Sequence, residues 1–263
     1  MPLVDYQTSA GIARLTLNDP PFNGYTHEMM KDLDAAILEA RFDNDVQIIV
    51  ITGHGEKFFC SGANVSMLRE ADSTFKYYFC LHANETLLRL EHTPKLTIAA
   101  INGHCVGGGL EIAMACDLRV ARKGGGKMGL PEVALGVLPG TGGTQRLGRL
   151  VGRSRAMQLM CEGTTFGFED GQALGLVHEL WDTPTHGEFI DKVSEYARRF
   201  TRPGKASLAV GHIKRALVSG LEVSLEQGLA LERELQAELF ASEDAKEGLS
   251  AYIEKRKPIF KGR

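Results

Sequence analysis

The 263-residue sequence has no long apolar run and no leader-like segment at its start. No stretch approaches the roughly 18–20 consecutive apolar residues that cross a bilayer. Residues 1–18, MPLVDYQTSAGIARLTLN, have no basic segment that leads into an apolar one, so they resemble neither a secretory signal nor a transit peptide. We therefore expect a cytoplasmic protein that does not contact a membrane.

Cysteines are few, and no two of them stand in C-x-x-C spacing. An odd number without that spacing argues against a disulfide framework and against a zinc site. Because free cysteine is among the most often buried residue types, we expect buried thiols at all five positions. These are Cys60, Cys80, Cys105, Cys116 and Cys161.

Neither sign of charge dominates, since 30 Lys and Arg stand against 33 Asp and Glu, for a formal net charge of -3. Such a chain has no global basic field that would attract nucleic acid or an anionic membrane. Hydrophobic residues make up 43% and charged residues 24%, which is ordinary for a globular protein. The length fits one large domain, or one domain with a small appendage.

Strand-like and helix-like segments follow one another in a strand–strand–helix order. HEMMKDLDAAILEAR (27–41) has helical periodicity, and the β-branched run VQIIVITGHG (46–55) reads as a buried strand. KFFCSGANVSML reads as a loop and then a helix, and residues 96–122 read as strand, glycine-rich turn, helix and strand. The segment ARLTLNDPP (13–21) reads as a strand that leads into a loop. Beyond residue 152 the chain is mostly helical, with helices expected at 155–163, 189–200, 207–220 and 221–242. We place a boundary near residue 200, which divides a core (1–200) from a helical region (201–263).

The stretch GGGLEIAMACD (107–117) sets three glycines directly before an apolar helix. No Lys-Ser or Lys-Thr follows, so it is not a P-loop, and the glycine spacing does not fit a dinucleotide fingerprint. What remains is a helix N-terminus, with its unpaired N–H groups, that a ligand can approach closely. The ligand group is expected to be an oxygen that is, or becomes, negative.

Two glutamates accompany this stretch. Glu111 lies in the first turn of the expected helix, where the helix dipole alone would favour a carboxylate. Glu132 follows Pro131 in an apolar neighbourhood, which tends to raise a carboxyl pKa and suits a proton donor. Two carboxylates held close together can divide acid and base roles. From these residues alone, both readings of Glu111 stay open.

Four segments, in this order, resemble the crotonase (enoyl-CoA hydratase/isomerase) family. They are FFCSGANVSML, INGHCVGGGLEIAMACDLRVA, GLPEVALGVLPGTGGTQRL and GLSAYIEKRKPIFKGR, and the resemblance covers nearly the whole chain. It implies an α/β fold of the ClpP/crotonase-like type, a spiral of ββα units followed by a helical C-terminal region that drives trimerisation. A homotrimer, or a homohexamer of two stacked trimers, is therefore expected.

The resemblance also implies chemistry on an acyl-CoA substrate. The thioester oxygen would be held by the backbone N–H groups of Ala63 and Gly108. Glu111 would orient and deprotonate the attacking water, and Glu132 would deliver or take the proton at Cα. Because relatives with both carboxylates add water, we expect an enoyl-CoA hydratase of fatty acid metabolism, a hydro-lyase that needs no metal or redox cofactor.

Further binding residues follow from the same resemblance. Gly140, in the PGTGG turn, is expected to place water or the thioester through its backbone, and Met67 begins the variable segment 67–84 that covers the acyl pocket. Tyr252 and Lys255 are expected to reach the CoA of a neighbouring subunit, Lys255 at a phosphate. The plain alternative for this basic tail is a solvated terminus.

Some positions have competing interpretations. Tyr77, Tyr78 and Phe79 either shape the acyl pocket or, more ordinarily, belong to the core, and His104 is expected to be structural. Asn64 stands where the family commonly has Asp, and FNGYTHEMM (22–30) replaces the usual Asn-Ala-Leu start of the first helix.

Two rival functions stay open. One is another CoA enzyme of this fold, either a double-bond isomerase or a hydratase of a branched or cyclic enoyl-CoA. The other is a non-catalytic protein that contacts RNA through its basic tail. The net charge of -3 and the lack of an aromatic–basic surface argue against RNA binding.

Overall fold

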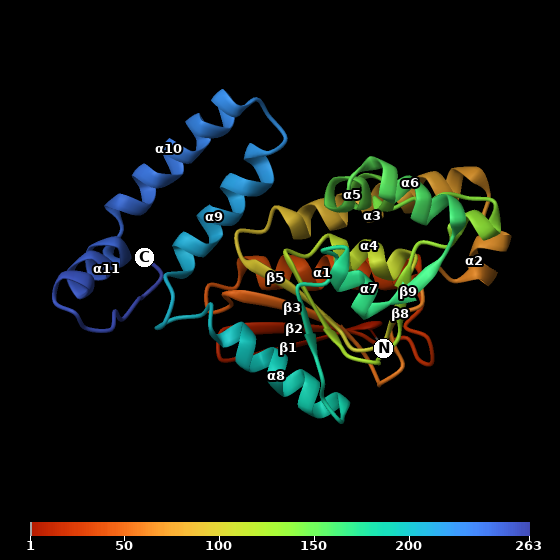
Figure 1. The fold of residues 1–263 in the computed structure, drawn as a ribbon, viewed down its shortest axis with the longest axis horizontal. Coiled ribbons are helices and arrows are strands. Elements are labelled where there is room, and N and C mark those ends of the chain that lie inside the picture. Colours follow the sequence, from red (N-terminus) through yellow and green to blue (C-terminus); the bar gives the residue numbers. More distant parts are fainter. Residues whose placement is uncertain (1) are drawn as a thin grey trace.

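The computed structural model describes residues 2–263, and Figure 1 shows a mixed α/β body from which a helical arm projects. The larger sheet begins with an antiparallel hairpin and continues with parallel strands. Its strands are, in spatial order, β1 (Val4–Ser9), β2 (Ile12–Leu17), β3 (Ile48–Gly53), β5 (Leu96–Ile101), β7 (Leu118–Arg122) and β10 (Glu179–Trp181). The predicted strands within 13–21, 46–55 and 96–122 are therefore confirmed.

A smaller sheet holds the second strand of each unit. It consists of β4 (Phe58–Cys60), β6 (His104–Val106), β8 (Lys127–Gly129) and β9 (Thr165–Gly167), of which only β9 is antiparallel to its neighbour. β3 and β4, β5 and β6, and β7 and β8 thus divide between the two sheets before the next helix begins. This confirms the predicted ββα spiral. The expectation of a loop at 57–60 is wrong, because a three-residue strand shows no periodicity of its own.

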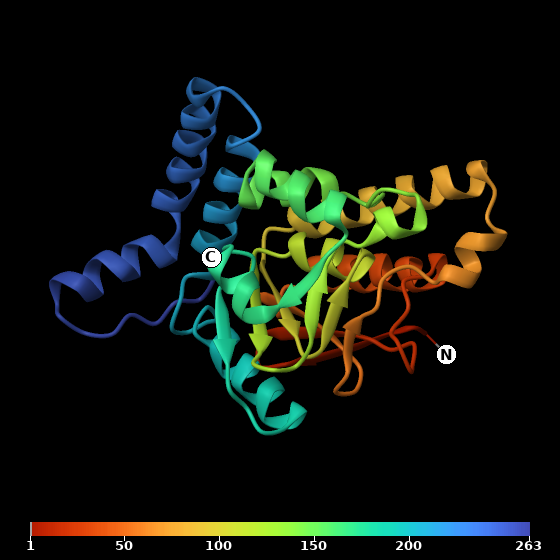
Figure 2. The ribbon, with the colours of Figure 1, turned by 45° about the vertical axis from the view of Figure 1, so that its right-hand side comes forward.

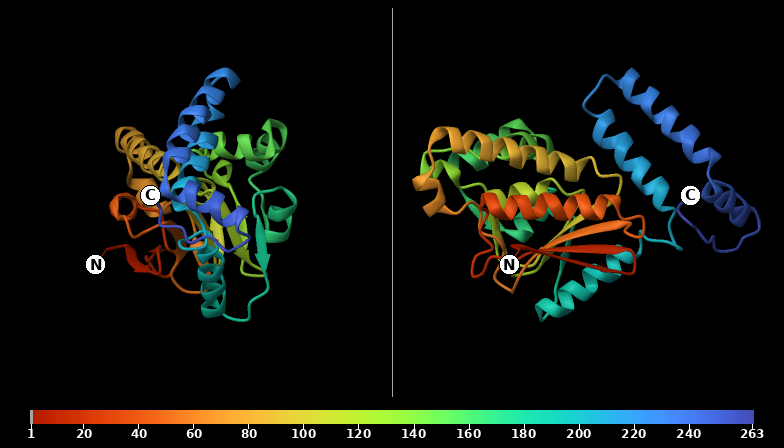
Figure 3. Two further views of the ribbon diagram at one scale, coloured as in Figure 1. Left: turned by 90° about the vertical axis from the view of Figure 1, so that its left-hand side faces the viewer. Right: turned by 180° about the vertical axis from the view of Figure 1, so that it is seen from behind.

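The larger sheet is covered on both faces, as Figure 3 shows in its right-hand view. α1 (His27–Phe42) and α3 (Ser73–Glu91) lie on one face, and α8 (His186–Arg198) lies on the other. Every residue of β3 is buried, as expected of a parallel strand packed on both sides. α1, predicted for 27–41, is capped at its N-terminus by Thr26, whose side chain accepts the Met29 N–H at 3.1 Å.

Six shorter helical segments complete the body, and α6 confirms the helix predicted for 155–163. They are α2 (Val65–Glu70), α4 (Gly108–Met114), η1 (Glu132–Leu135), α5 (Gly143–Val151), α6 (Arg153–Glu162) and α7 (Phe168–Ala173).

The C-terminal arm consists of α9 (Ser207–Gly220), α10 (Leu225–Ala241) and α11 (Glu243–Ile253). Figure 2 shows α9 and α10 as a hairpin that stands away from the sheet, with α11 continuing outward. An ion pair ties α9 to the body, since Nζ of the buried Lys214 lies 2.8 Å from the carboxylate of the half-buried Asp117. The predicted helix within 221–242 starts only at Leu225, because Ser224 caps it with Gln227 in a capping box. The division at residue 200 stays a prediction.

Burial of the cysteines follows the prediction only in part. All five are free, and Cys60, Cys105 and Cys116 are buried as expected. Cys80 is half-buried, and Cys161 is exposed on α6, so the expectation is wrong at Cys161. Within residues 2–263, no helix is both long enough and apolar enough to span a bilayer.

Candidate active site

The glycine-rich turn at the start of α4 leaves no room for side chains. Gly107 adopts φ +55°, the left-handed region that favours glycine. A Cβ on Gly108 would lie 2.7 Å from Cδ1 of Tyr25, and one on Gly109 would lie 2.4 Å from the Cys60 carbonyl oxygen. Three consecutive glycines are therefore a steric requirement, and they leave the helix N-terminus bare.

The SGAN segment lies directly beside this turn, because a Cβ on Gly62 would stand 3.5 Å from the Gly108 nitrogen. Tyr25 N donates to the Gly62 carbonyl at 2.9 Å, and Asn64 N donates to the Tyr25 carbonyl at 3.3 Å. Ala63 lies between Gly62 and Asn64 and forms a parallel β-bridge with Tyr25. In such a bridge the N–H of Ala63 points away from Tyr25. Gly108, as the first residue of α4, carries an N–H without an intrahelical acceptor. Two backbone donors thus lie on adjacent segments.

Asn64 retains the structural task that an aspartate would have there. It is the N-cap of α2, and its side-chain oxygen accepts the Met67 N–H at 3.1 Å. Asn and Asp are comparable N-caps, so the departure from the family pattern leaves this loop anchored.

Glu111 is buried and rigidly held by the turn that precedes α5. Its Oε1 accepts the N–H groups of Thr141 at 2.8 Å and Gly143 at 2.7 Å, and its Oε2 accepts the Thr141 hydroxyl. Hydrogen bonds to a carboxylate are among the stronger ones in proteins. Because each carboxylate oxygen has two lone pairs, Oε2 keeps one acceptor position for another partner.

Glu132 approaches the same turn from η1. A Cβ on Gly107 would lie 3.0 Å from Glu132 Oε1, while Oε2 is buried without a hydrogen-bond partner among residues 2–263. Burial raises the pKa of the Glu132 carboxyl to about 7; its own backbone hydrogen bond opposes this shift, and the charge of Glu111 adds to it. A carboxyl group with such a pKa exchanges protons readily near neutral pH.

The remaining turn residue, Gly140, lies next to α3, since a Cβ there would stand 3.0 Å from Cys80 Sγ. Met67, on α2, is half-buried against the main core. The structure therefore brings Ala63, Gly108, Glu111 and Glu132 together around the α4 N-terminus. Gly140 precedes the Thr141 that holds Glu111.

Comparison with known proteins agrees with this geometry. The family model described as Enoyl-CoA hydratase/isomerase matches residues 7–263. The chain belongs to this family. The predicted family and the predicted fold class are thus confirmed.

Individual members of the enoyl-CoA hydratase/isomerase family align over almost the full chain. A crystal structure of an enoyl-CoA hydratase from Geobacillus kaustophilus HTA426 superposes with a TM-score of 0.96 at 44% identity, covering 100% of this chain and 98% of that one. The short-chain-enoyl-CoA hydratase of Clostridium acetobutylicum is 37% identical, over 94% of this chain and 92% of its own. The 2,3-dehydroadipyl-CoA hydratase of Escherichia coli is also 37% identical, over 95% and 94%.

One residue of the candidate site, Tyr25, is not predicted from the sequence. Tyr25 is buried, with 2% of its surface exposed, and its ring packs between Gly108 and Phe79, whose ring centroid is 5.3 Å away. Its hydroxyl has no hydrogen-bond partner among the described residues. The one signal in the sequence is FNGYTHEMM, where an aromatic residue stands in place of the usual leucine.

The other aromatic and histidine candidates have structural explanations. Phe79 is fully buried, whereas Tyr77 and Tyr78 are exposed on the same helix, so the three do not form one pocket wall. His104 accepts the Lys127 N–H at Nδ1 (3.1 Å) and packs on Phe58. The geometry of His104 thus agrees with the structural role expected for it.

Tyr252 and Lys255 lie far from the glycine turn of their own chain. Both are exposed near the end of α11, Tyr252 with 86% of its surface accessible, and Figure 1 shows α11 at the far end of the arm. Any role for them in the site requires a second subunit, and their contact with CoA stays a prediction.

No metal cluster stands out in the described part of the chain. Among residues 2–263, no three His, Cys, Asp or Glu side chains are grouped so that they could hold a metal ion. The expectation of a reaction without metal or redox cofactor stays a prediction.

Proposed function

We propose that this protein is an enoyl-CoA hydratase, which adds water reversibly and in syn fashion across a 2-trans-enoyl-CoA to give a 3-hydroxyacyl-CoA. One observation carries the proposal: two carboxylates, Glu111 and Glu132, flank a bare helix N-terminus that lies beside a second backbone donor. Membership of the enoyl-CoA hydratase/isomerase family and the hydratase relatives support it.

The backbone donors polarise the substrate. The N–H groups of Ala63 and Gly108 bind the thioester oxygen, on which negative charge gathers as water adds to C3. The steric crowding around Gly108 holds this peptide in place before the substrate arrives. Preorganised donors of this kind are worth about 3–4 kcal/mol each in the transition state.

The two carboxylates divide the proton transfers. Glu111, fixed by Thr141 and Gly143, takes a proton from the water whose oxygen forms the bond to C3. Glu132, whose pKa is raised to about 7 by burial, gives its proton to C2. After the addition, one proton has left Glu132 and one has arrived on Glu111, so the pair carries one proton before and after each turnover.

The length of the acyl chain is a separate question. The relatives' names include a short-chain and a dehydroadipyl hydratase, so one family fold serves different acyl groups. A hydratase of a branched or cyclic enoyl-CoA, or a double-bond isomerase, is the alternative that substrate profiling tests.

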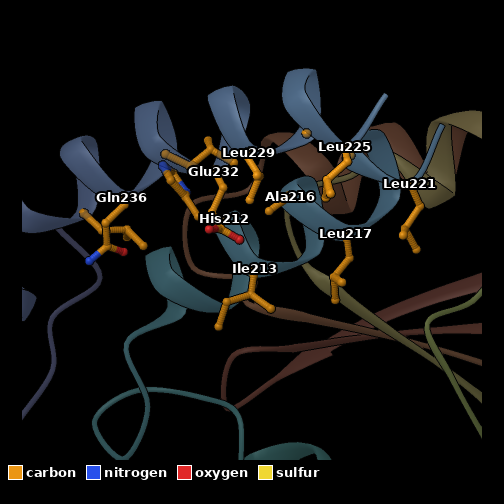
Figure 4. Close-up of a pocket in the computed structure, with 13 residues that line it drawn as sticks. His212, Ile213, Ala216, Leu217, Leu221, Leu225, Leu229, Glu232 and Gln236 are labelled. Carbon is orange, nitrogen blue, oxygen red and sulfur yellow. The ribbon is translucent and has the colours of Figure 1, made fainter. Parts of the chain in front are cut away.

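The exposed apolar surface of the C-terminal arm supports the proposal that the enzyme is an oligomer. Figure 4 shows a groove between α9 and α10 that is lined by Ile213, Leu217, Leu221, Leu225 and Leu229, all of them exposed. An apolar surface of this kind marks an interaction site. We propose that it is covered in a homotrimer or homohexamer, in which Tyr252 and Lys255 reach the CoA of a neighbour. A cytoplasmic location is part of the same proposal.

The test follows the absorbance of crotonyl-CoA, whose conjugated thioester absorbs in the ultraviolet whereas the hydrated product does not. Wild type is run beside Glu111→Gln, Glu132→Gln and the control Glu195→Gln, an exposed residue of α8. We expect both active-site variants to lose at least about 10³-fold in rate and the control to match wild type. If wild type leaves crotonyl-CoA unchanged, a short straight-chain hydratase is the wrong assignment.

A further inference from the structure

Tyr25 is built into the candidate site through both its backbone and its ring. Its N–H and C=O pair with Gly62 and Asn64, on either side of Ala63. Its ring fills the space over Gly108 that a side chain there would occupy. One residue therefore contacts both segments that carry the expected oxyanion donors.

The hydroxyl of Tyr25 is buried within reach of the electrostatic field of the Glu111 carboxylate. Burial, and after it the nearby charge of Glu111, raise the pKa of Tyr25 well above its ordinary value, so the phenol is neutral at neutral pH and can donate a hydrogen bond. The side chain of Thr141 opposes this rise in the pKa of Tyr25, but the Thr141 hydroxyl proton is donated to Glu111 and is not available to the phenol oxygen. Within residues 2–263, the Tyr25 hydroxyl has no hydrogen-bond partner.

Such an isolation is costly unless a ligand relieves it, because a buried hydroxyl without a partner loses its hydrogen bonds to water. A second orphan atom, Glu132 Oε2, belongs to the same site, and Glu111 Oε2 keeps one free acceptor position. The site thus offers a hydrogen-bond donor on Tyr25, a protonated carboxyl on Glu132 and an acceptor on Glu111. These are the groups that the addition of a water oxygen to a carbon atom requires.

We propose that the Tyr25 hydroxyl is a further catalytic residue, which donates a hydrogen bond to the oxygen that attacks C3 in hydration and leaves C3 in dehydration. This rests on the proposed hydratase function. In hydration, the water donates one proton to Glu111 and directs one lone pair to C3, and the Tyr25 O–H engages its other lone pair. In dehydration, the same O–H binds the 3-hydroxyl oxygen as the C3–O bond breaks. Tyr25 itself neither gains nor loses a proton.

The first measurement is steady-state hydration of crotonyl-CoA by Tyr25→Phe. Removal of one orienting contact at a reacting atom should lower kcat about 10- to 100-fold and leave KM within about twofold. The control is Tyr6→Phe, since the Tyr6 hydroxyl is also buried without a partner but belongs to the outer strand β1, near Glu39 of α1 and Asp43, the C-cap of that helix. Tyr6→Phe should match wild type.

A second measurement needs no turnover. Calorimetric affinity is compared for 3-hydroxybutyryl-CoA, which carries the C3 oxygen, and butyryl-CoA, which lacks it. Tyr25→Phe should bind 3-hydroxybutyryl-CoA about three- to tenfold more weakly and butyryl-CoA as wild type does. The melting temperature should stay equal or rise, because the change removes a hydroxyl without a partner.

The outcomes separate the two proposals. If wild type does not hydrate crotonyl-CoA, the proposed function fails. If wild type is active and Tyr25→Phe retains its kcat, the Tyr25 inference is wrong. A fall in melting temperature with unchanged kcat would instead assign the hydroxyl to a structural hydrogen bond with Thr141.

Discussion

The glycine turn of α4 is tightly packed, whereas the C-terminal arm leaves large apolar side chains exposed to solvent. Around the turn, the Glu111 carboxylate accepts three hydrogen bonds, and the packing excludes even a methyl group from Gly108 and Gly109. On the arm, large apolar side chains stand in the open, with Leu225 78% exposed. One chain alone therefore completes the packing around its candidate site but leaves the apolar side chains of the arm exposed.

The difference indicates which properties belong to one subunit and which belong to the assembly. In the proposed function, proton transfer and oxyanion binding would depend on contacts within residues 25–143, whereas binding of the CoA moiety would depend on the arm of another copy. Substitutions within residues 25–143 should therefore lower mainly kcat, whereas substitutions on the arm should raise mainly KM.

Apart from the two carboxylate substitutions, the largest effect is expected at Gly108 in the turn itself. In Gly108→Ala the new Cβ meets the Tyr25 ring at 2.7 Å, which must displace the peptide that carries the proposed oxyanion donor. We expect kcat/KM for crotonyl-CoA to fall about 10²- to 10³-fold. The control is Gly148→Ala in α5, where a Cβ meets nothing within 4 Å. Equal activity of the two variants would contradict the assignment of Gly108.

The arm is tested by placing a charge on its apolar groove. Leu225→Glu puts a carboxylate at the first residue of α10, where the helix dipole tolerates it, so the fold should survive. Sedimentation should show that wild type is a trimer or hexamer and that the variant dissociates. KM for the CoA thioester should rise at least about tenfold. A matched change, Phe42→Glu on α1, should leave the assembly intact; a monomeric wild type would refute the role of the arm.

A smaller, more local effect tests Lys255. Lys255→Ala removes an exposed ammonium that the assembly would place at a CoA phosphate, and KM should rise about three- to tenfold while kcat is unchanged. Lys257→Ala, two residues away and also exposed, is the control. If both variants behave alike, the tail acts as a solvated terminus.

Local pattern made much of this fold predictable. The helix at 27–41 and the strand at 46–55 carry their periodicity within a dozen residues, and both formed where expected. The sequence does not reveal β4 and β6, because three residues show no alternation and these strands form only through pairing with other short strands, β4 with β6 and β6 with β8. The same limit applies to Cys161, whose exposure depends on the face that α6 turns outward.

The candidate site was predictable to a similar degree. Glu111, Glu132 and the glycine turn are visible as residue types at a spacing that resembles a known family. The support of Glu111 by Thr141 and Gly143 is not visible, because it joins segments about thirty positions apart. Tyr25 was overlooked for the same reason, since the isolation of its hydroxyl is a result of packing among three distant segments.

Arg146 offers a test of how the turn is supported. Its guanidinium forms two 2.7 Å hydrogen bonds with Glu91 and donates to the Thr141 carbonyl at 3.0 Å. Arg146 therefore fixes the position of Thr141, which in turn donates hydrogen bonds to Glu111. Arg146→Lys loses the planar fork, and we expect kcat to fall about tenfold with little change in KM. Arg149→Lys, whose partner Glu222 lies on the surface, should retain full activity. Unchanged kcat in Arg146→Lys would show that Glu111 is positioned without it.

The smallest expected effect concerns pH and Glu132. Its pKa is about 7 in the folded protein, above the ordinary value of 4.5, so the folded state holds the proton more tightly than the unfolded state does. Unfolding free energy should therefore decrease as pH rises from about 4.5 to about 7, because ionisation of the buried carboxyl then favours unfolding. Glu132→Gln removes this cost, so its melting temperature should exceed that of wild type at pH 8 and equal it at pH 4.

Since the carboxylate pair carries one proton in both reaction directions, kcat/KM of wild type should decline above about pH 7 with the same apparent pKa for hydration and for dehydration. Different apparent pKa values in the two directions would contradict a shared proton.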